Sequence, residues 1–75
     1  MTRLPVVSGN DIIKYLSKKN FYLDRIKGSH FILKSIDKTK TIPVPHHTEL
    51  DRGTLRNILL LANIDIDEFI DEWNN

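Results

Sequence analysis

The chain has no cysteine and no long apolar segment. Without thiols it forms neither disulfides nor thiolate metal sites. No apolar run approaches the roughly 18 residues that a membrane-spanning helix requires, and residues 1–5 lack the apolar core of a signal peptide. We therefore expect a protein of the reducing cytoplasm with no membrane partner. A chain of 75 residues has the length of one domain.

The formal net charge of +1 conceals an asymmetry along the chain. Residues 1–46 hold nine lysines and arginines against three acids, a net charge of +6. Residues 47–75 hold two against seven, a net charge of −5. A basic surface suits the phosphate backbone of a nucleic acid, whereas an acidic end suits solubility or a protein partner. An ordinary solvated surface accounts for the same charges equally well.

The first part of the chain predicts a helix followed by three strands. Ser8 and Asp11 have the spacing of a capping box, and apolar residues recurring on one helical face indicate a helix over residues 9–19. Three segments rich in aromatic and β-branched residues follow, joined by short turns: 21–26, 30–36 and 39–44. Connections this short predict an antiparallel meander. Pro43 and Pro45 cannot donate ladder hydrogen bonds, so the third strand is expected at an edge of the sheet.

The last third of the chain predicts two helices. Apolar residues at i, i+3, i+4 and i+7 mark a buried stripe, formed by Leu55, Ile58, Leu59 and Ala62. Asp51 is the expected N-cap of this helix and Asn63 its end. Asp65 with Glu68 gives a second capping signal, and the apolar spacing recurs in a short last helix, at Ile66, Phe69, Ile70 and Trp73.

These elements predict an α+β domain spanning residues 1–75. Its expected architecture is a three-stranded antiparallel sheet with helices packed on one face, in the order α-β-β-β-α-α.

The run Lys27-Gly28-Ser29-His30 places a histidine directly after a tight turn. A Gly-Ser turn carries the imidazole on a rigid strand, and the ordinary pKa of histidine, about 6.5, allows proton transfer near neutral pH. If Phe31 and Leu33 lie under the helices, alternation sends His30, Ile32 and Lys34 to the uncovered face. A one-residue change of register would reverse this assignment. An isolated Gly-Ser-His is more often a structural feature of a hairpin than a catalytic one.

His46 and His47 follow the third strand and are interpreted as loop residues. Adjacent side chains on a strand diverge, and no thiolate or spaced carboxylate completes a set of metal ligands around the three histidines. We therefore expect neither a metal nor a small-molecule cofactor.

Taken in order, these motifs resemble the HicA (YcfA-like) family of bacterial mRNA interferase toxins, which has a fold like that of double-stranded-RNA-binding domains. The resemblance runs from about residue 8 to residue 69. The matching segments are Ser8-Gly9, Lys27-Gly28-Ser29-His30, Ile42-Pro43-Val44-Pro45-His46, Glu49-Leu50, Gly53-Thr54-Leu55-Arg56, Ile58-Leu59 and Asp67-Glu68-Phe69. No single segment is specific, and it is their order and spacing that carry the resemblance.

The resemblance implies a toxin that cleaves mRNA and is blocked by a HicB-type antitoxin, with His30 as the catalytic residue. Members often carry a polar or histidine residue directly after this position, where this chain has Phe31. The expected enzyme is a metal-independent endoribonuclease in which His30 is the general acid or base. Residues close to His30 in the sequence are the expected RNA contacts: Lys27, Gly28, Ser29, Arg25 and Lys34.

A second interpretation is a module that binds double-stranded RNA by shape and phosphate contacts without cutting it. Such a module would carry several lysines at the start of the helix after the sheet. This chain has Asp51, Arg52, Gly53 and Arg56 there instead, which favours the nuclease.

Overall fold

A computed structural model describes residues 4–74 as three helices and one three-stranded sheet. The elements are α1 (Gly9–Ser17), β1 (Phe21–Lys27), β2 (His30–Ser35), β3 (Thr41–Pro45), α2 (Arg52–Leu61) and α3 (Ile66–Trp73). The predicted α+β class and the order α-β-β-β-α-α are confirmed. This order is compatible with the double-stranded-RNA-binding-domain fold that the family resemblance implies.

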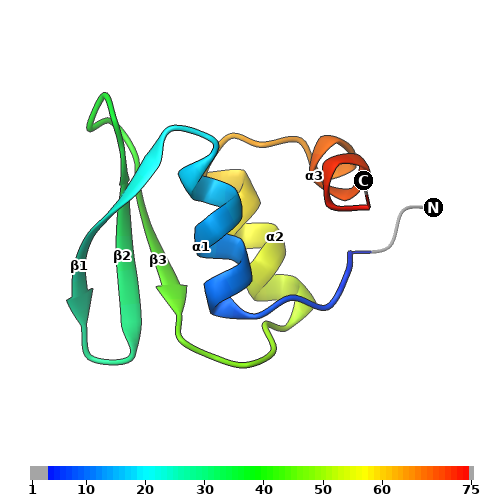
Figure 1. Ribbon diagram of the computed structural model, residues 1–75, viewed down its shortest axis with the longest axis horizontal. Helices are drawn as coiled ribbons and strands as arrows, with labels where there is room; N and C mark the ends of the chain where they lie inside the picture. Colours follow the sequence, from blue (N-terminus) through cyan, green and yellow to red (C-terminus); the bar gives the residue numbers. More distant parts are fainter. Residues whose placement is uncertain (1–3, 75) are drawn as a thin grey trace.

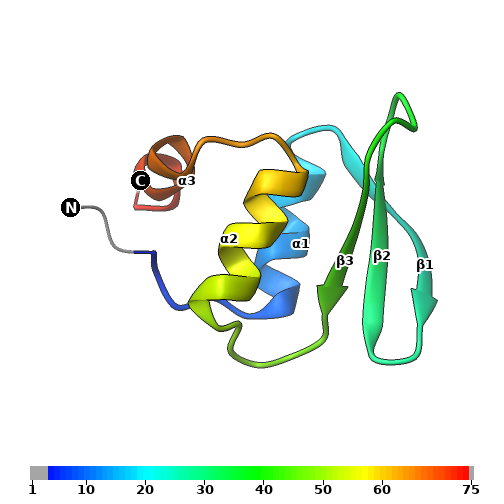
Figure 2. The ribbon, with the colours of Figure 1, turned by 180° about the vertical axis from the view of Figure 1, so that it is seen from behind.

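The sheet has the strand order β1-β2-β3, and both pairs of strands are antiparallel. β3 lies at an edge, as its two prolines predict, and β1 forms the other edge. The helices α1 and α2 run side by side and cover one face of the sheet (Figures 1 and 2). No described element covers the opposite face, which we call the open face.

The hydrophobic core lies between the covered face of the sheet and the two helices. Its fully buried side chains come from all of these elements and include Leu33, Ile42, Val44, Ile12, Leu16, Leu55 and Leu59. Burying one such side chain contributes about 1.5–3 kcal/mol, so this set orients the sheet strongly. The predicted apolar stripe of α2 is confirmed, because Leu55, Ile58, Leu59 and Ala62 are all buried.

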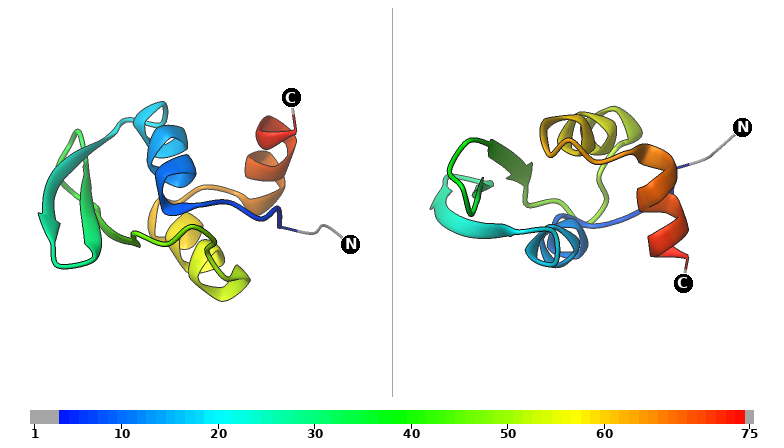
Figure 3. Two further views of the ribbon diagram at one scale, coloured as in Figure 1. Left: turned by 60° about the horizontal axis from the view of Figure 1, so that its bottom comes forward. Right: turned by 90° about the horizontal axis from the view of Figure 1, so that it is seen from above.

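The third helix lies on the far side of α1 and α2 from the sheet (Figure 3). Its Phe69 is fully buried and meets the ring of Tyr15 edge-on, with ring centroids 4.8 Å apart. Trp73 stacks on Phe69 with centroids 5.6 Å apart. Two helices therefore pack on the strands, while α3 packs on those helices.

The ends of the helices follow the predicted caps. Ser8 and Asp11 form a capping box, and Asp51 accepts the amide of Thr54 at the start of α2. Asn63, after the end of α2, has a φ of 59°, a left-handed conformation that asparagine tolerates better than most residues. Asp65 caps α3 by accepting the amide of Asp67 rather than that of Glu68.

The turn between β2 and β3 is wider than predicted, since β2 ends at Ser35 and β3 begins at Thr41. The Ser35 hydroxyl accepts the amides of Thr39 and Lys40 and donates to Asp37 at 2.6 Å. The hydrogen bond from the Ser35 hydroxyl, with those that Thr39 donates to Asp37, lowers the pKa of the Asp37 carboxyl to about 2. Side-chain hydrogen bonds thus hold this turn in place of further strand pairing.

Glu72 joins α3 to α1. Its carboxylate accepts hydrogen bonds from Lys19 Nζ at 2.8 Å and from the Tyr15 hydroxyl at 2.7 Å. The hydrogen bond from Lys19, followed by that from Tyr15, lowers the pKa of Glu72 below its ordinary value of 4.5. Burial and the hydrogen bond to Glu72 raise the pKa of Tyr15. The folded state therefore favours the charged carboxylate.

Replacing Glu72 by glutamine (Glu72→Gln) is expected to destabilise the protein at neutral pH more than at acidic pH. Since the folded pKa of Glu72 is depressed, its contribution is complete above the ordinary value and is lost as the pH falls through the folded pKa. Urea unfolding at several pH values between 7 and 2.5 measures this difference. Glu49→Gln, at an exposed carboxylate without a described partner, is the control. A stability difference that stays constant over the pH range would contradict the assignment.

Candidate nucleic-acid interface

His30 is the first residue of β2 and points to the open face. It pairs with Lys27 on β1 and with Pro45 on β3, and it is exposed. Leu33, three positions further along the same strand, is fully buried under the helices. Because side chains alternate along a strand, the predicted orientation of His30 is confirmed. Phe31 lies on the covered face as predicted, although it is only partly buried.

The turn before His30 depends on Gly28. Gly28 has a φ of 61°, whereas Ser29 is not among the residues with positive φ. A glycine at the first of two central positions is typical of a type II′ hairpin turn. An added Cβ at Gly28 would meet no atom within 4 Å, so the backbone angle rather than space favours glycine. The turn fixes Lys27 and His30 as the last pair of the hairpin.

An irregularity in β1 brings two cations to the face that carries His30. The pairing of β1 with β2 shifts between Leu23 and Arg25, so Asp24 is an extra residue in the strand. Arg25 then pairs with Ile32, and Lys27 pairs with His30. Opposed residues of an antiparallel pair share a face, and a one-residue shift exchanges the faces of all residues beyond it. The bulge therefore places Arg25 and Lys27 on the open face.

Asp24 neutralises part of this positive charge. Its carboxylate lies 3.4 Å from Arg25 Nη1 and 3.9 Å from Lys34 Nζ. Among residues 4–74, Lys27 has no ion pair, so it is the cation beside His30 that stays uncompensated. The structure thus brings Lys27, Arg25 and Lys34 onto one face with His30, but only Lys27 is free to bind a phosphate there without competition.

Three residues of the open face were not predicted as part of a site: Tyr22, Asp24 and Ile32. Tyr22 pairs with Lys34 and is 37% exposed, and Ile32 is only 8% exposed although no helix covers it. Ile32 lies between Arg25 on β1 and Pro43 on β3. Sequence proximity to His30 favoured Arg25 and Lys34, whereas Tyr22 and Asp24 become neighbours of the site only through strand pairing.

His46 and His47 have structural positions. The His46 ring meets Phe31 edge-on, with ring centroids 4.7 Å apart, and its amide donates to the Ser29 carbonyl at 2.8 Å. Phe31 lies on the covered face, so the His46 ring and the His30 ring stand on opposite sides of the sheet. The carbonyl of His47 accepts the amide of Gly9 at 2.9 Å. The His46 contacts hold the end of β3 against the β1–β2 turn, and the His47 contact holds the following loop against the start of α1.

The acidic last helix lies far from the cations around His30. The acidic helix α3 and the open face lie at opposite ends of the longest dimension, which is 34 Å (Figure 1). Exposed charges separated by more than the Debye length, about 8 Å at physiological salt, are largely screened from each other. The acids of α3 therefore do not weaken the positive potential around Lys27. Arg3, which contributes to the basic half, lies outside the described residues.

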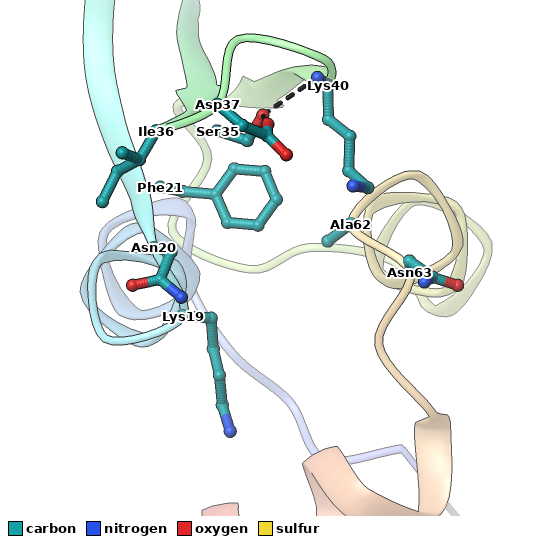
Figure 4. A pocket seen from close by; sticks show the side chains of 9 residues that line it. All are labelled: Lys19, Asn20, Phe21, Ser35, Ile36, Asp37, Lys40, Ala62 and Asn63. Atoms are coloured by element: carbon teal, nitrogen blue, oxygen red, sulfur yellow. Dashed lines mark hydrogen bonds between the residues drawn. The ribbon is translucent and has the colours of Figure 1, made fainter.

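A pocket of about 370 Å³ opens at the other end of the sheet, between the start of β1, the β2–β3 turn and the end of α2 (Figure 4). Its lining includes Phe21, Lys19, Asp37 and Lys40 but none of the histidines. Lys19 is bound to Glu72, and Asp37 is held within its own turn. The pocket therefore lacks a group suited to proton transfer near neutral pH.

Within residues 4–74, no cluster of three or more histidine or carboxylate side chains has the arrangement of a metal site. In the same part of the chain, no helix combines the length and the apolar character needed to cross a membrane.

The molecule is a small α+β protein whose open face carries an exposed imidazole beside cations. Such a surface is suited to polyanions. In a comparison with known protein families, the family model described as "HicA toxin of bacterial toxin-antitoxin" matches residues 9–64. The chain therefore belongs to the HicA toxin family, and this membership implies an antitoxin partner. No curated protein and no solved structure gives a significant match.

Gly9, the first residue of α1, fixes the segment that follows β3. A methyl group at this position would overlap the carbonyl oxygen of Pro45, and the Gly9 amide already binds the His47 carbonyl. The start of α1 and the end of β3 are thus in direct backbone contact, next to the strand pair of Pro45 and His30.

Replacing Gly9 by alanine is expected to lower the free energy of unfolding by about 1–3 kcal/mol, because the backbone of β3 must move to admit the methyl group. Urea denaturation measures the change. The control is Gly53→Ala near the start of α2, where the new Cβ would lie 3.8 Å from the Asp51 carboxylate and alanine favours the helix by roughly 0.5–1 kcal/mol. Equal stability of the two variants would contradict a tight contact at Gly9.

Proposed function

We propose that this HicA-family toxin is an endoribonuclease that cleaves mRNA, with His30 as its general acid or base, and that a HicB-type antitoxin blocks it. The observation that carries the proposal is the position of His30, exposed on the open face and paired with Lys27. The type II′ turn and the strand ladders on both sides hold this residue in place.

RNA supplies its own nucleophile, the 2′-hydroxyl next to the scissile phosphate. His30 accepts the proton of this hydroxyl while its oxygen attacks phosphorus. The bond from phosphorus to the 5′-oxygen breaks, and that oxygen takes a proton from water. The products are a 2′,3′-cyclic phosphate and a 5′-hydroxyl. A positioned general base contributes about 10²- to 10⁴-fold to such a reaction.

Lys27 stabilises the negative charge that develops on the phosphoryl oxygens. It lies directly opposite His30 and has no carboxylate partner among residues 4–74. The backbone of Gly28 and Ser29 forms the adjoining turn, which brings the phosphate close to both side chains. Arg25 and Lys34 add positive potential that attracts RNA to this face.

The same open face suits an antitoxin. A cationic and solvent-exposed surface is readily covered by an acidic partner, and charge complementarity of this kind accelerates association. Covering His30 and Lys27 would exclude RNA without any change in the fold of the toxin.

A duplex-binding module without catalysis accounts less well for the start of α2. That position carries Asp51, whose carboxylate caps the helix by accepting the Thr54 amide. Hydrogen bonding to Thr54 lowers the pKa of Asp51, so a negative charge stands where such a module would hold phosphate.

Replacing His30 by alanine is expected to reduce RNA cleavage by about 100- to 10,000-fold and to abolish growth arrest. Stability should change by less than about 0.5 kcal/mol, because the side chain is exposed. Cleavage of a labelled single-stranded RNA and thermal melting test both parts. His47→Ala, in the loop after β3, is the matched control and should keep full activity. Undiminished growth arrest by the His30→Ala variant would assign catalysis to another residue.

Cleavage of single-stranded RNA by the wild-type protein is expected to persist in excess EDTA, because the proposed nucleophile and base both act without a metal ion. Rates measured with EDTA and with added Mg²⁺ should agree within about twofold, well inside the 10²-fold scale of general base catalysis. RNA left intact only in EDTA would contradict the metal-independent mechanism. RNA left intact in both conditions would favour the duplex-binding module.

A further inference from the structure

We propose that Tyr22, Asp24 and Lys34 form a nucleobase subsite on the open face, which binds a base of single-stranded RNA next to the cleavage site. The inference rests on the proposed function and adds to it the strand type of the substrate and a source of sequence preference. It concerns the end of the open face away from the β1–β2 turn.

The charges on the open face divide it into two regions. Around His30 and Lys27, no carboxylate of the described residues 4–74 is paired with the lysine, which suits a phosphate. In the other region, the Asp24 carboxylate lies 3.9 Å from Lys34 Nζ and 3.4 Å from Arg25 Nη1. The Asp24 carboxylate would repel a second phosphate in this region, but it would not repel an uncharged base. The two regions therefore suit different parts of a nucleotide.

The surface of the second region offers exposed apolar groups to a base. Tyr22 is 37% exposed, so part of its ring is open to solvent. Pro43 on β3, which pairs with the buried Ile32, is exposed and extends this surface across the sheet. Bases of single-stranded RNA stack on exposed aromatic rings of this kind.

Asp24 and Lys34 supply polar groups at the rim of that surface. A carboxylate accepts from the exocyclic amino group of a base, and a lysine donates to ring nitrogens or carbonyl oxygens. Uracil has no amino group to donate to Asp24. The subsite therefore favours a base with an amino group, and a paired base in a duplex could not reach it because its edge is occupied.

The distance along the strand agrees with a subsite for a neighbouring nucleotide. His30 and Lys34 are separated by four steps of β2, about 13 Å at 3.3 Å per residue. A phosphate at His30 and a base at Lys34 thus belong to different nucleotides of one extended strand.

The test measures binding of short fluorescent single-stranded RNAs by the His30→Ala variant, which binds without cutting, at one fixed salt concentration. Adding Tyr22→Leu is expected to weaken binding about 5- to 100-fold, the range reported for loss of one base stack. Adding Tyr22→Phe should leave binding within about twofold, because the ring rather than the hydroxyl makes the stack. The control is Leu23→Ala, on the opposite face of the same strand and 46% exposed, which should not change affinity.

Asp24→Asn in the same background tests recognition of the amino group. The affinity for cytidine- or guanosine-containing RNA should fall relative to that for oligouridine. Uniformly tighter binding to all RNAs would mean that Asp24 only repels phosphate and would overturn the subsite. Preferential binding of duplex RNA, or unchanged binding with Tyr22→Leu, would also overturn it.

Failure of the subsite is distinguishable from failure of the proposed nuclease. If wild-type protein cleaves RNA in a His30-dependent manner but Tyr22→Leu binds as tightly as its parent, only the subsite is wrong. If neither wild-type protein nor the His30→Ala variant cleaves or binds any RNA, the proposed function is wrong as well.

Discussion

One extra residue in β1 determines which side chains share a face with His30. Strict alternation from the buried Phe21 would turn Arg25 and Lys27 to the covered face, away from His30. The bulge at Asp24 exchanges the two faces beyond it. Lys27 then pairs with His30, and Arg25 with Ile32. Bulges are common next to functional sites because they redirect a side chain without disturbing the rest of the sheet. In this toxin the bulged residue is itself charged, and it pairs with the cations that the bulge has redirected.

The division of the sheet into two faces gives the candidate site both access and rigidity. Burial of Leu33, Ile42 and Val44 under α1 and α2 prevents β2 and β3 from turning over. The opposite face remains open to a polymer or a protein. Gly28 sets the turn before His30, while the close approach of Gly9 to Pro45 fixes the end of β3 on the other side. An imidazole held between two paired strands loses little conformational freedom when a substrate binds, which is an advantage for a catalytic group.

The distribution of charge fits the RNA binding proposed for this protein and its control by an antitoxin. Five of the ten acidic residues lie in α3 or cap it, at the far end of the molecule from the open face (Figure 3): Asp65, Asp67, Glu68, Asp71 and Glu72. Glu72 is tied to Lys19 and Tyr15 there, so part of the acidic charge has a structural role in holding α3 to α1. The positive potential of the open face is left for polyanions and for acidic surfaces of an antitoxin.

The sequence by itself determined the order of the elements, the caps at Ser8 and Asp51, the edge position of β3 and the orientation of His30. These features depend on local propensity, on prolines that cannot donate ladder hydrogen bonds, and on apolar alternation along β2. Each of these signals can be recognised within a few residues of sequence. It could not determine the bulge, because one strand pattern is compatible with more than one register. Only the tertiary structure placed Tyr22 and Asp24 beside Lys34, gave α3 its position behind the other helices, and brought Gly9 against Pro45. Each of those contacts joins residues distant along the chain, and their relative position follows from packing rather than from local preference.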